Sequence, residues 1–168
     1  LNTWAPIPSL RRSWTGSMKV SMGYPLPAEE SRILSRFQQE NPLESLRPVA
    51  ESGDIISLQD KVKSVYVDKS LNNYIVQLVG QTRSHPDVSL GCSPRGSLAL
   101  FRASQAWAFY SGRNYVIPDD IKKMAVPVLS HRIILKQEAR LKKVCQQDVL
   151  ESIINRINVP LVDFYEAK

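Results

Sequence analysis

The sequence has few of the residues that build metal sites or disulfide frameworks. Its 168 residues include two cysteines, Cys92 and Cys145, and two histidines, His85 and His131. Their spacing fits neither a disulfide framework nor a zinc motif of the CxxC or HxxxH type. We therefore expect no metal site, and we expect both thiols to be reduced in a cytoplasmic protein.

Long apolar runs are also absent. No stretch approaches the roughly 20 apolar residues that a membrane span needs, and the opening residues LNTWAPIPSLRRSW contain no apolar signal core. The hydrophobic fraction of 43% and the charged fraction of 23% are typical of a globular protein in water. The formal net charge of +6 permits contact with polyanions without requiring it. We expect no membrane contact.

A third absence concerns nucleotide chemistry. The sequence contains no GxxxxGK[ST] phosphate loop, and no apolar strand that ends in paired acids able to hold magnesium. The chain alone is therefore expected to bind nucleotide weakly or not at all, and not to hydrolyse it.

The first part of the chain predicts a strand followed by a helix. Residues 1–17 are irregular, whereas MKVSMGYP (18–25) alternates apolar and polar residues as a strand does. The next stretch begins with Pro27, places Ile33, Leu34 and Phe37 on one helical face, and ends at Asn41. One strand and one helix cannot bury a sheet, so residues 18–44 are interpreted as the end of a larger α/β domain. A connector over residues 45–54 follows.

Helical periodicity dominates residues 55–160, which predict an all-helical bundle, with a tail at 161–168. A first helix carries Leu58, Val62 and Val65 on one face. The second is capped by Asp68, and its apolar stripe consists of Leu71, Tyr74, Ile75, Leu78 and Val79.

Three further helices are predicted in this part. The third has Ser93 as its cap, Pro94 at its first position and an inward set of Leu98, Phe101, Ala106 and Phe109. The fourth begins at Pro118, with Asp119 and Asp120 in its first turn, and its inward set is Ile121, Met124, Ala125 and Leu129. HRIIL (131–135) is predicted to be extended, and the last helix covers 148–157.

Arg95 is the residue that most needs an explanation. It falls in the first turn of the third helix, where the helix dipole favours anions over cations. Gly91, Ser93 and Pro94 fix where this helix begins, and Gly96 is expected to leave the space beside Arg95 free of a side chain. No acidic residue is close in sequence, and a guanidinium held there suits a phosphate.

The segment LGCSPRGSLALFRASQAWAFYSGRNYVIPDDIKKMAVPVLSHRIIL (90–135) resembles the lid domain of the MoxR family of AAA+ ATPases. The linked SPR, GRNYVIPDD and VLSHR blocks carry this resemblance, which covers roughly residues 18–160. It implies a mainly α chain, with a helical-bundle AAA+ lid domain preceded by a strand–helix remnant of the α/β AAA+ core.

The resemblance also implies roles. Arg95 corresponds to the sensor-2 arginine, which reaches the γ-phosphate of ATP in an intact core and contributes to catalysis there, with Ser93 and Pro94 shaping the nucleotide-binding end of the helix. The intact protein would use ATP and Mg²⁺. It would form a ring of identical subunits and remodel partner complexes, with von Willebrand factor A domain proteins among its partners.

Other polar residues of these blocks are expected to be structural. Arg113 and Asp120 are interpreted as an ion pair or cap in the turn between two helices. His131 and Arg132 are expected to form structural hydrogen bonds, since no nucleophile or carboxylate pair accompanies them. Arg83 and His85 are expected to anchor a loop.

Two functions from other classes compete with that of a remodelling ATPase. The chain could be a non-catalytic helical interaction module, or a nucleic-acid-binding domain. The second rests on net charge and on the basic cluster of Lys136, Arg140, Lys142 and Lys143, which lacks interleaved aromatic residues. A solvated surface is the simpler interpretation of that cluster.

Residues 1–17 do not follow the MoxR pattern, whose members carry Glu-Leu-Asp-Arg-Phe just before the strand. One choice of codons for residues 12–17 encodes that pentapeptide in a shifted reading frame. Our hypothesis is that this segment is out of frame relative to an intact coding sequence. Codons upstream of Met18 that cannot encode the pentapeptide in another frame would end this hypothesis.

Overall fold

The computed structural model describes residues 18–20, 22–38 and 41–160. The expectations for residues 1–17 and 161–168 lie outside the described residues. The chain divides into two compact units, a smaller one over Val20–Asp60 and a larger one that contains the residues from Lys61 onward.

The smaller unit contains helices with no buried residue. α1 covers Pro27–Phe37 and confirms the predicted helix, with Pro27 in its first turn and Glu29 accepting a hydrogen bond from the Leu26 N–H at 2.9 Å. A 3₁₀ helix follows at Pro42–Ser45. α2 covers Ser52–Lys63, so it begins inside the predicted connector. It also ends before Val65, which is buried outside any helix, while Leu58 is exposed.

The predicted strand at 18–25 is wrong. Residues 18–20 and 22–25 contain no strand, and their side chains are exposed. A strand is stable only when a neighbouring strand satisfies its backbone groups. Within the described residues the segment makes one backbone hydrogen bond, from the Lys19 N–H to the Pro127 carbonyl at 2.9 Å, and no strand lies beside it. The alternating pattern therefore produces no strand here.

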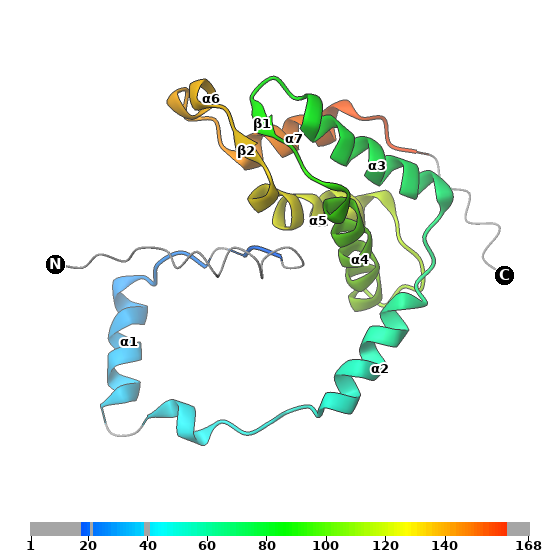
Figure 1. Cartoon of the computed structure of the whole chain (residues 1–168). Helices are drawn as coiled ribbons and strands as arrows, with labels where there is room; N and C mark the ends of the chain where they lie inside the picture. Colours follow the sequence, from blue (N-terminus) through cyan, green and yellow to red (C-terminus); the bar gives the residue numbers. More distant parts are fainter. Residues whose placement is uncertain (1–17, 21, 39–40, 161–168) are drawn as a thin grey trace. The chain divides into compact units, whose positions relative to one another are not determined.

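Four main helices build the larger unit (Figure 1): α3 (Lys69–Ser84), α4 (Pro94–Tyr110), α5 (Pro118–Leu129) and α7 (Gln146–Arg156). All four were predicted, and α7 begins two residues earlier than expected. The Asp68 carboxylate caps α3 by accepting the Ser70 N–H at 2.7 Å. Together with the small sheet below, they confirm the mainly α fold class.

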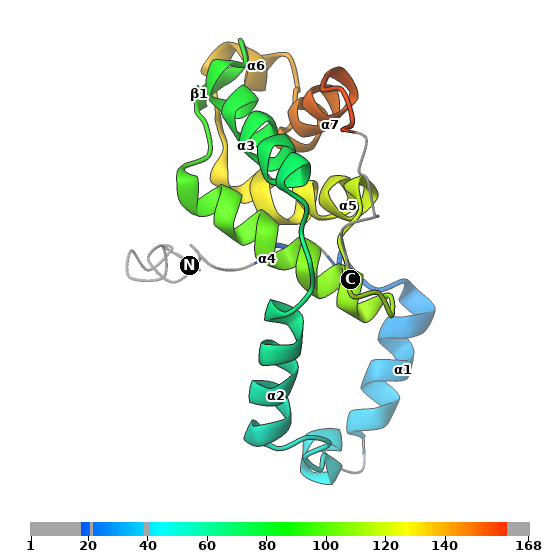
Figure 2. The same cartoon turned by 90° about the vertical axis from the view of Figure 1, so that its right-hand side faces the viewer.

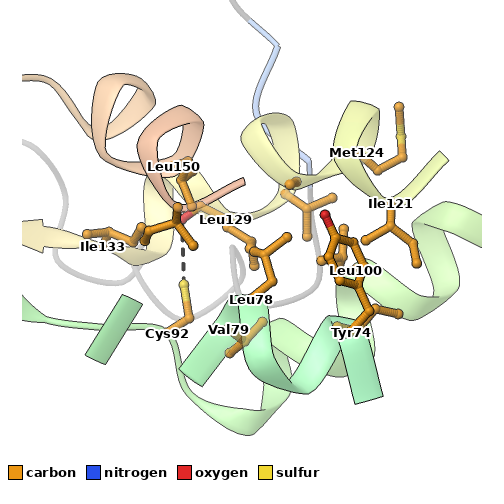
Figure 3. Close-up of a cluster of buried hydrophobic side chains, with 14 of the residues drawn as sticks. Tyr74, Leu78, Val79, Cys92, Leu100, Ile121, Met124, Leu129, Ile133 and Leu150 are labelled. Carbon is orange, nitrogen blue, oxygen red and sulfur yellow. Dashed lines mark hydrogen bonds between the residues drawn. The ribbon is translucent and has the colours of Figure 1, made fainter. Parts of the chain in front are cut away.

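The core of this unit lies between α3, α4, α5 and α7 (Figure 3). The predicted stripes of α3 and α5 are buried, as are Val149, Leu150 and Ile153 of α7. The predicted inward face of α4 is confirmed only in part: Phe101 and Phe109 are half-buried against the core, whereas Ala106 is exposed and Leu98 is 60% exposed. The most deeply buried side of α4 carries Gly96, Leu100, Ser104 and Ala108. Small residues at this spacing let α4 pack closely against α5.

A short antiparallel sheet and one further helix complete the unit. β1 (Val88–Leu90) pairs with β2 (Ile134–Leu135), so HRIIL is extended only at its end, since Ser130–Arg132 form a 3₁₀ helix. β1 and the five-residue helix α6 (Gln137–Leu141) were not predicted. Figure 2 shows β1 and α6 together at one end of the unit, near the end of α3.

Candidate functional site

Arg95 lies in the first turn of α4, as predicted. Ser93 is the N-cap residue with extended backbone (φ −76°, ψ 169°), and Pro94 opens the helix. The Ser93 carbonyl accepts the Gly96 N–H at 2.8 Å, whereas the Ser93 side chain forms no capping hydrogen bond. The Arg95 side chain is exposed, and it forms no hydrogen bond or ion pair with any described residue. An anion that approaches this end of α4 would meet both a guanidinium and a helix N-terminus.

The loop before α4 is fastened to the end of α3 by two hydrogen bonds. The Cys92 N–H donates to Thr82 Oγ1 at 2.9 Å, and Arg83 Nε donates to the Cys92 carbonyl at 2.8 Å. The Thr82 hydroxyl donates in turn to the Val79 carbonyl at 2.6 Å, inside α3. We call Thr82, Arg83 and Cys92 the clasp. It fixes the position from which α4 presents Arg95.

Gly91 makes the clasp sterically feasible. A Cβ atom at this position would lie 2.7 Å from backbone atoms of Thr82 and Arg83. Backbone atoms cannot rotate away as a flexible side chain can, so the close approach of the loop to α3 requires glycine.

Gly96 does not leave an open space beside Arg95, which corrects the expectation from sequence. Gly96 is buried, and a Cβ there would lie 3.2 Å from Cys92 Cβ and 3.4 Å from Leu129 Cδ2. Glycine at this position lets the first turn of α4 pack against the end of α5. The close packing therefore lies under the helix start, away from the exposed Arg95 side chain.

Cys92 is a buried structural thiol. Its Sγ lies 3.8 Å from the Leu129 carbonyl, to which it donates a weak hydrogen bond (Figure 3). Burial raises the pKa of the Cys92 thiol, which keeps the group protonated and unreactive. Cys145 is exposed, and both cysteines are free thiols.

Arg113 and Asp120 form the predicted ion pair. Arg113 Nη1 and Nη2 donate to the two Asp120 oxygens at 2.7 and 2.6 Å. Asp120 also accepts the Ile117 N–H at 2.9 Å, and its side chain is 3% exposed. The hydrogen bonds to Asp120 raise the pKa of Arg113. This pair fixes the turn between α4 and α5, and the hydrogen-bonding capacity of the buried carboxylate is used within that turn.

Arg83 and His85 both anchor structure, as predicted, but to different partners. Arg83 belongs to the clasp. His85 Nδ1 accepts the Asp87 N–H at 3.2 Å, and its Nε2 lies 3.3 Å from Ser152 Oγ on α7. The Ser152 hydroxyl donates to the Val149 carbonyl at 2.8 Å, so Nε2 is the donor toward Ser152. The serine proton is thus used by its own helix, which excludes a serine–histidine nucleophile here.

The remaining predicted residues lie at the end of α5 and on α6. Arg132 Nε donates to the Val128 carbonyl at 2.7 Å, which confirms a structural hydrogen bond. His131 is half-buried in the same 3₁₀ helix. The basic cluster surrounds α6 with exposed side chains. In the described segments, no three side chains of the types His, Cys, Asp or Glu are grouped so as to hold a metal ion.

Two buried polar residues that hold connecting segments to the helices were not singled out from the sequence. Thr82 holds the clasp, and Gln105 Nε2 donates to the Val65 carbonyl at 2.8 Å. Arg102 holds the Gln105 amide by donating to its oxygen at 2.9 Å. The available signal was a polar side chain on an otherwise small and apolar helix face.

Among the described residues, no helix is both long enough and apolar enough to cross a membrane.

Comparison with known proteins places these features in a family. The AAA lid domain family matches residues 80–153, which include the clasp, Arg95 and the Arg113–Asp120 pair. The Bacillus subtilis (strain 168) protein YeaC is 43% identical over 143 residues, covering 85% of this chain and 45% of YeaC. Chaperone MoxR1 of Mycobacterium tuberculosis is 29% identical, covering 94% of this chain and 44% of that protein.

A solved structure agrees with the sequence relatives. The crystal structure of a candidate ATPase from Cytophaga hutchinsonii superposes with a TM-score of 0.80 at 27% identity, over 94% of this chain and 50% of that one. The chain thus spans about half the length of the proteins that it resembles over most of its residues.

Proposed function

Because the chain corresponds to the C-terminal part of a MoxR-family AAA+ ATPase and carries its lid domain, we propose that this lid senses ATP through Arg95 in the intact protein. The observation that carries the proposal is an exposed guanidinium without a partner among the described residues, on a helix start that the clasp holds in place.

The chemistry of this helix end fits a terminal phosphate. A guanidinium cannot lose its proton at any physiological pH, and its planar fork matches phosphate oxygens. The N-terminus of α4 adds positive potential in the same direction. When bound, ATP would supply the phosphoryl group, and Mg²⁺ would neutralise part of its charge. Arg95 would stabilise the negative charge that develops during transfer.

Sensing follows from the same contact. The lid would have one position in which Arg95 contacts the phosphate and one in which it does not. Bound ATP would shift the balance toward the first position. Since α4 is packed into the core of the larger unit, movement of Arg95 toward the phosphate would carry the lid with it.

The wider activity extends the proposal to the whole protein. We propose a chaperone-like ATPase that works in the cytoplasm as a ring of identical subunits. It would remodel or mature partner complexes, with von Willebrand factor A domain proteins as candidate partners. The lid would contact its own AAA+ core and the neighbouring subunit. The chain alone would lack activity, since its sequence has no phosphate loop.

The test is hydrolysis by the intact ATPase with Arg95→Ala in its lid. We expect the turnover number to fall about a hundredfold, the magnitude typical of one lost charge-stabilising donor, while the unfolding midpoint stays unchanged. Arg95→Lys should retain part of the rate. Lys69→Ala, an exposed cation of the same lid, is the matched control. An unchanged turnover number in Arg95→Ala would remove the proposed role.

The interaction-module alternative is separated by binding measurements on this chain alone. If the chain is the lid-bearing part of an ATPase, calorimetry should detect no affinity of the isolated chain for Mg–ATP. The DNA upstream of the chain should then encode a phosphate loop. A coding sequence with its own start codon and no such loop would favour the non-catalytic module.

A further inference from the structure

One end of the larger unit combines exposed basic and aliphatic side chains that the proposed function does not use. α6 follows β2 directly and projects at the end where β1 and β2 lie (Figures 1 and 2). We call this surface the α6 patch, and its residues are Ile134, Lys136, Arg140, Leu141, Lys142 and Lys143.

The aliphatic part of the α6 patch is open to solvent. Leu141 is 78% exposed and Ile134 is 47% exposed. Leu90, the partner of Ile134 across the sheet, is also largely exposed. Val88 and Leu135, the neighbouring pair, are buried, so one face of the sheet belongs to the core and the other is left uncovered.

The basic part of the patch carries a net positive charge. Residues 136–143 contain four basic side chains and one acidic side chain, Glu138. All four cations are exposed, and within the described part of the chain none of them forms a side-chain hydrogen bond or ion pair. The patch is therefore a cationic surface with aliphatic side chains inside it.

Lys143 occupies a backbone conformation that favours glycine. Its φ is +60°, and it is the residue with which the α6 helix closes: the Lys143 N–H donates to the Arg140 carbonyl and the Val144 N–H to the Ala139 carbonyl, both at 3.0 Å. α4 ends with the same arrangement, and there the position is Gly112, with φ +76°. A lysine at this position costs stability, so its charge is not explained by folding.

We propose that the α6 patch binds an acidic segment of a partner protein that also carries aliphatic side chains. Its carboxylates would pair with Lys136, Arg140, Lys142 and Lys143. Its aliphatic side chains would cover Ile134 and Leu141. The short sheet also offers strand edges without a strand partner among the described residues, along which an extended segment can lie.

Protein fits this surface better than nucleic acid does. The α6 patch has no aromatic side chain on which bases could stack, and its exposed leucine and isoleucine have no counterpart on a phosphate backbone. A bilayer would use the cations and aliphatic side chains but not the strand edges.

The experiment measures binding of this chain to a fluorescein-labelled peptide of about ten residues in which leucine recurs among aspartate and glutamate. Fluorescence anisotropy should show binding that weakens as salt is raised. A peptide with serine in place of each leucine should bind several-fold more weakly. If the two peptides bind equally, the aliphatic part of the proposal is wrong.

The variants separate binding from folding. Lys142→Glu combined with Lys143→Glu should lower the affinity at least tenfold, and Leu141→Ser several-fold. Lys61→Glu combined with Lys69→Glu changes the net charge equally and should stay within twofold of wild type. Lys143→Gly should raise the unfolding midpoint and still weaken binding, a combination that loss of folding cannot produce.

Three results would overturn the proposal. The first is equal affinity of the patch variants and the wild type for the acidic peptide. The second is tighter binding, through the same residues, of a DNA duplex of about 20 base pairs. The third is tighter binding of vesicles made of phosphatidylserine and phosphatidylcholine.

Discussion

The Cys92 main-chain nitrogen lies 2.9 Å from Thr82 Oγ1, a hydrogen bond that joins the loop before α4 to the last turn of α3. Both residues are buried, so no water can replace the threonine oxygen as acceptor. The geometry at Arg95 thus depends on a threonine located in a different helix.

Thr82→Val tests this bond. Valine keeps the shape of threonine but leaves the Cys92 N–H without an acceptor, which should lower the free energy of unfolding by about 1–3 kcal/mol. Thr82→Ser keeps the hydroxyl and should lose clearly less. Urea denaturation of the three proteins measures the difference. A smaller loss in Thr82→Val than in Thr82→Ser would mean that the methyl group, rather than the hydrogen bond, matters.

Gly91→Ala should be strongly destabilising. The added methyl group would lie 2.7 Å from backbone atoms of α3, and relieving this clash should cost about 2 kcal/mol or more. Gly80→Ala is the matched control, because it lies inside α3 with nothing within 4 Å of its Cβ position. There the substitution should raise stability by about 0.5–1 kcal/mol. Thermal unfolding of both variants shows whether the two effects have opposite signs.

Asp68 should make the stability of the chain depend on acid pH. Hydrogen bonds from the Ser70 side chain and backbone hold the pKa of Asp68 below its usual value of 3.8. The unfolded chain therefore binds this proton more readily. The contribution of Asp68 is complete above the unfolded pKa and is lost as the pH falls through the folded one.

Asp68→Ala should accordingly cost about 1 kcal/mol at neutral pH, and the difference from wild type should shrink in strong acid. Asp68→Asn keeps an acceptor without the titrating charge, so its stability should not show this component of the pH dependence. Urea unfolding across pH 2–7 measures all three. A constant difference between wild type and Asp68→Ala would contradict this account of the cap.

Arg113→Ala should leave the Asp120 carboxylate buried without its counter-charge. Removing one partner of a buried pair typically costs about 3 kcal/mol or more. Adding Asp120→Asn to the first variant removes the uncompensated charge while retaining an acceptor for the Ile117 N–H. The double variant should therefore be more stable than Arg113→Ala alone, as measured by chemical denaturation. The reverse order would exclude an electrostatic origin.

The sequence predicted the helices whose signals are local. Asp68 followed by a regular apolar stripe is sufficient to place α3, and Pro118 with two aspartates places α5. The inward face of α4 is predicted only in part, because the sequence does not mark Gly96 and Ser104 as core residues. Small residues become buried where two helices pack closely. Whether this happens depends on the neighbouring helix and not on the hydrophobicity of the residue itself.

The site was predicted in part for the same reason. The position of Arg95 follows from Ser93 and Pro94, which are adjacent to it. The clasp does not follow, because Thr82 and Cys92 are ten residues apart and meet only once the chain has folded. At residues 18–25 the local signal is present, but its partner is not among the described residues. An alternating pattern produces a strand only when another strand pairs with it.

Gln105 lies roughly 15 Å beyond Arg95 along α4, and its amide holds the Val65 carbonyl in the segment that follows α2. In the proposed function, α4 would therefore connect the phosphate contact of Arg95 at one end to the chain segment at Val65 near the other. A displacement of Arg95 would then be passed along the helix axis to Val65, where the polypeptide enters the helical bundle.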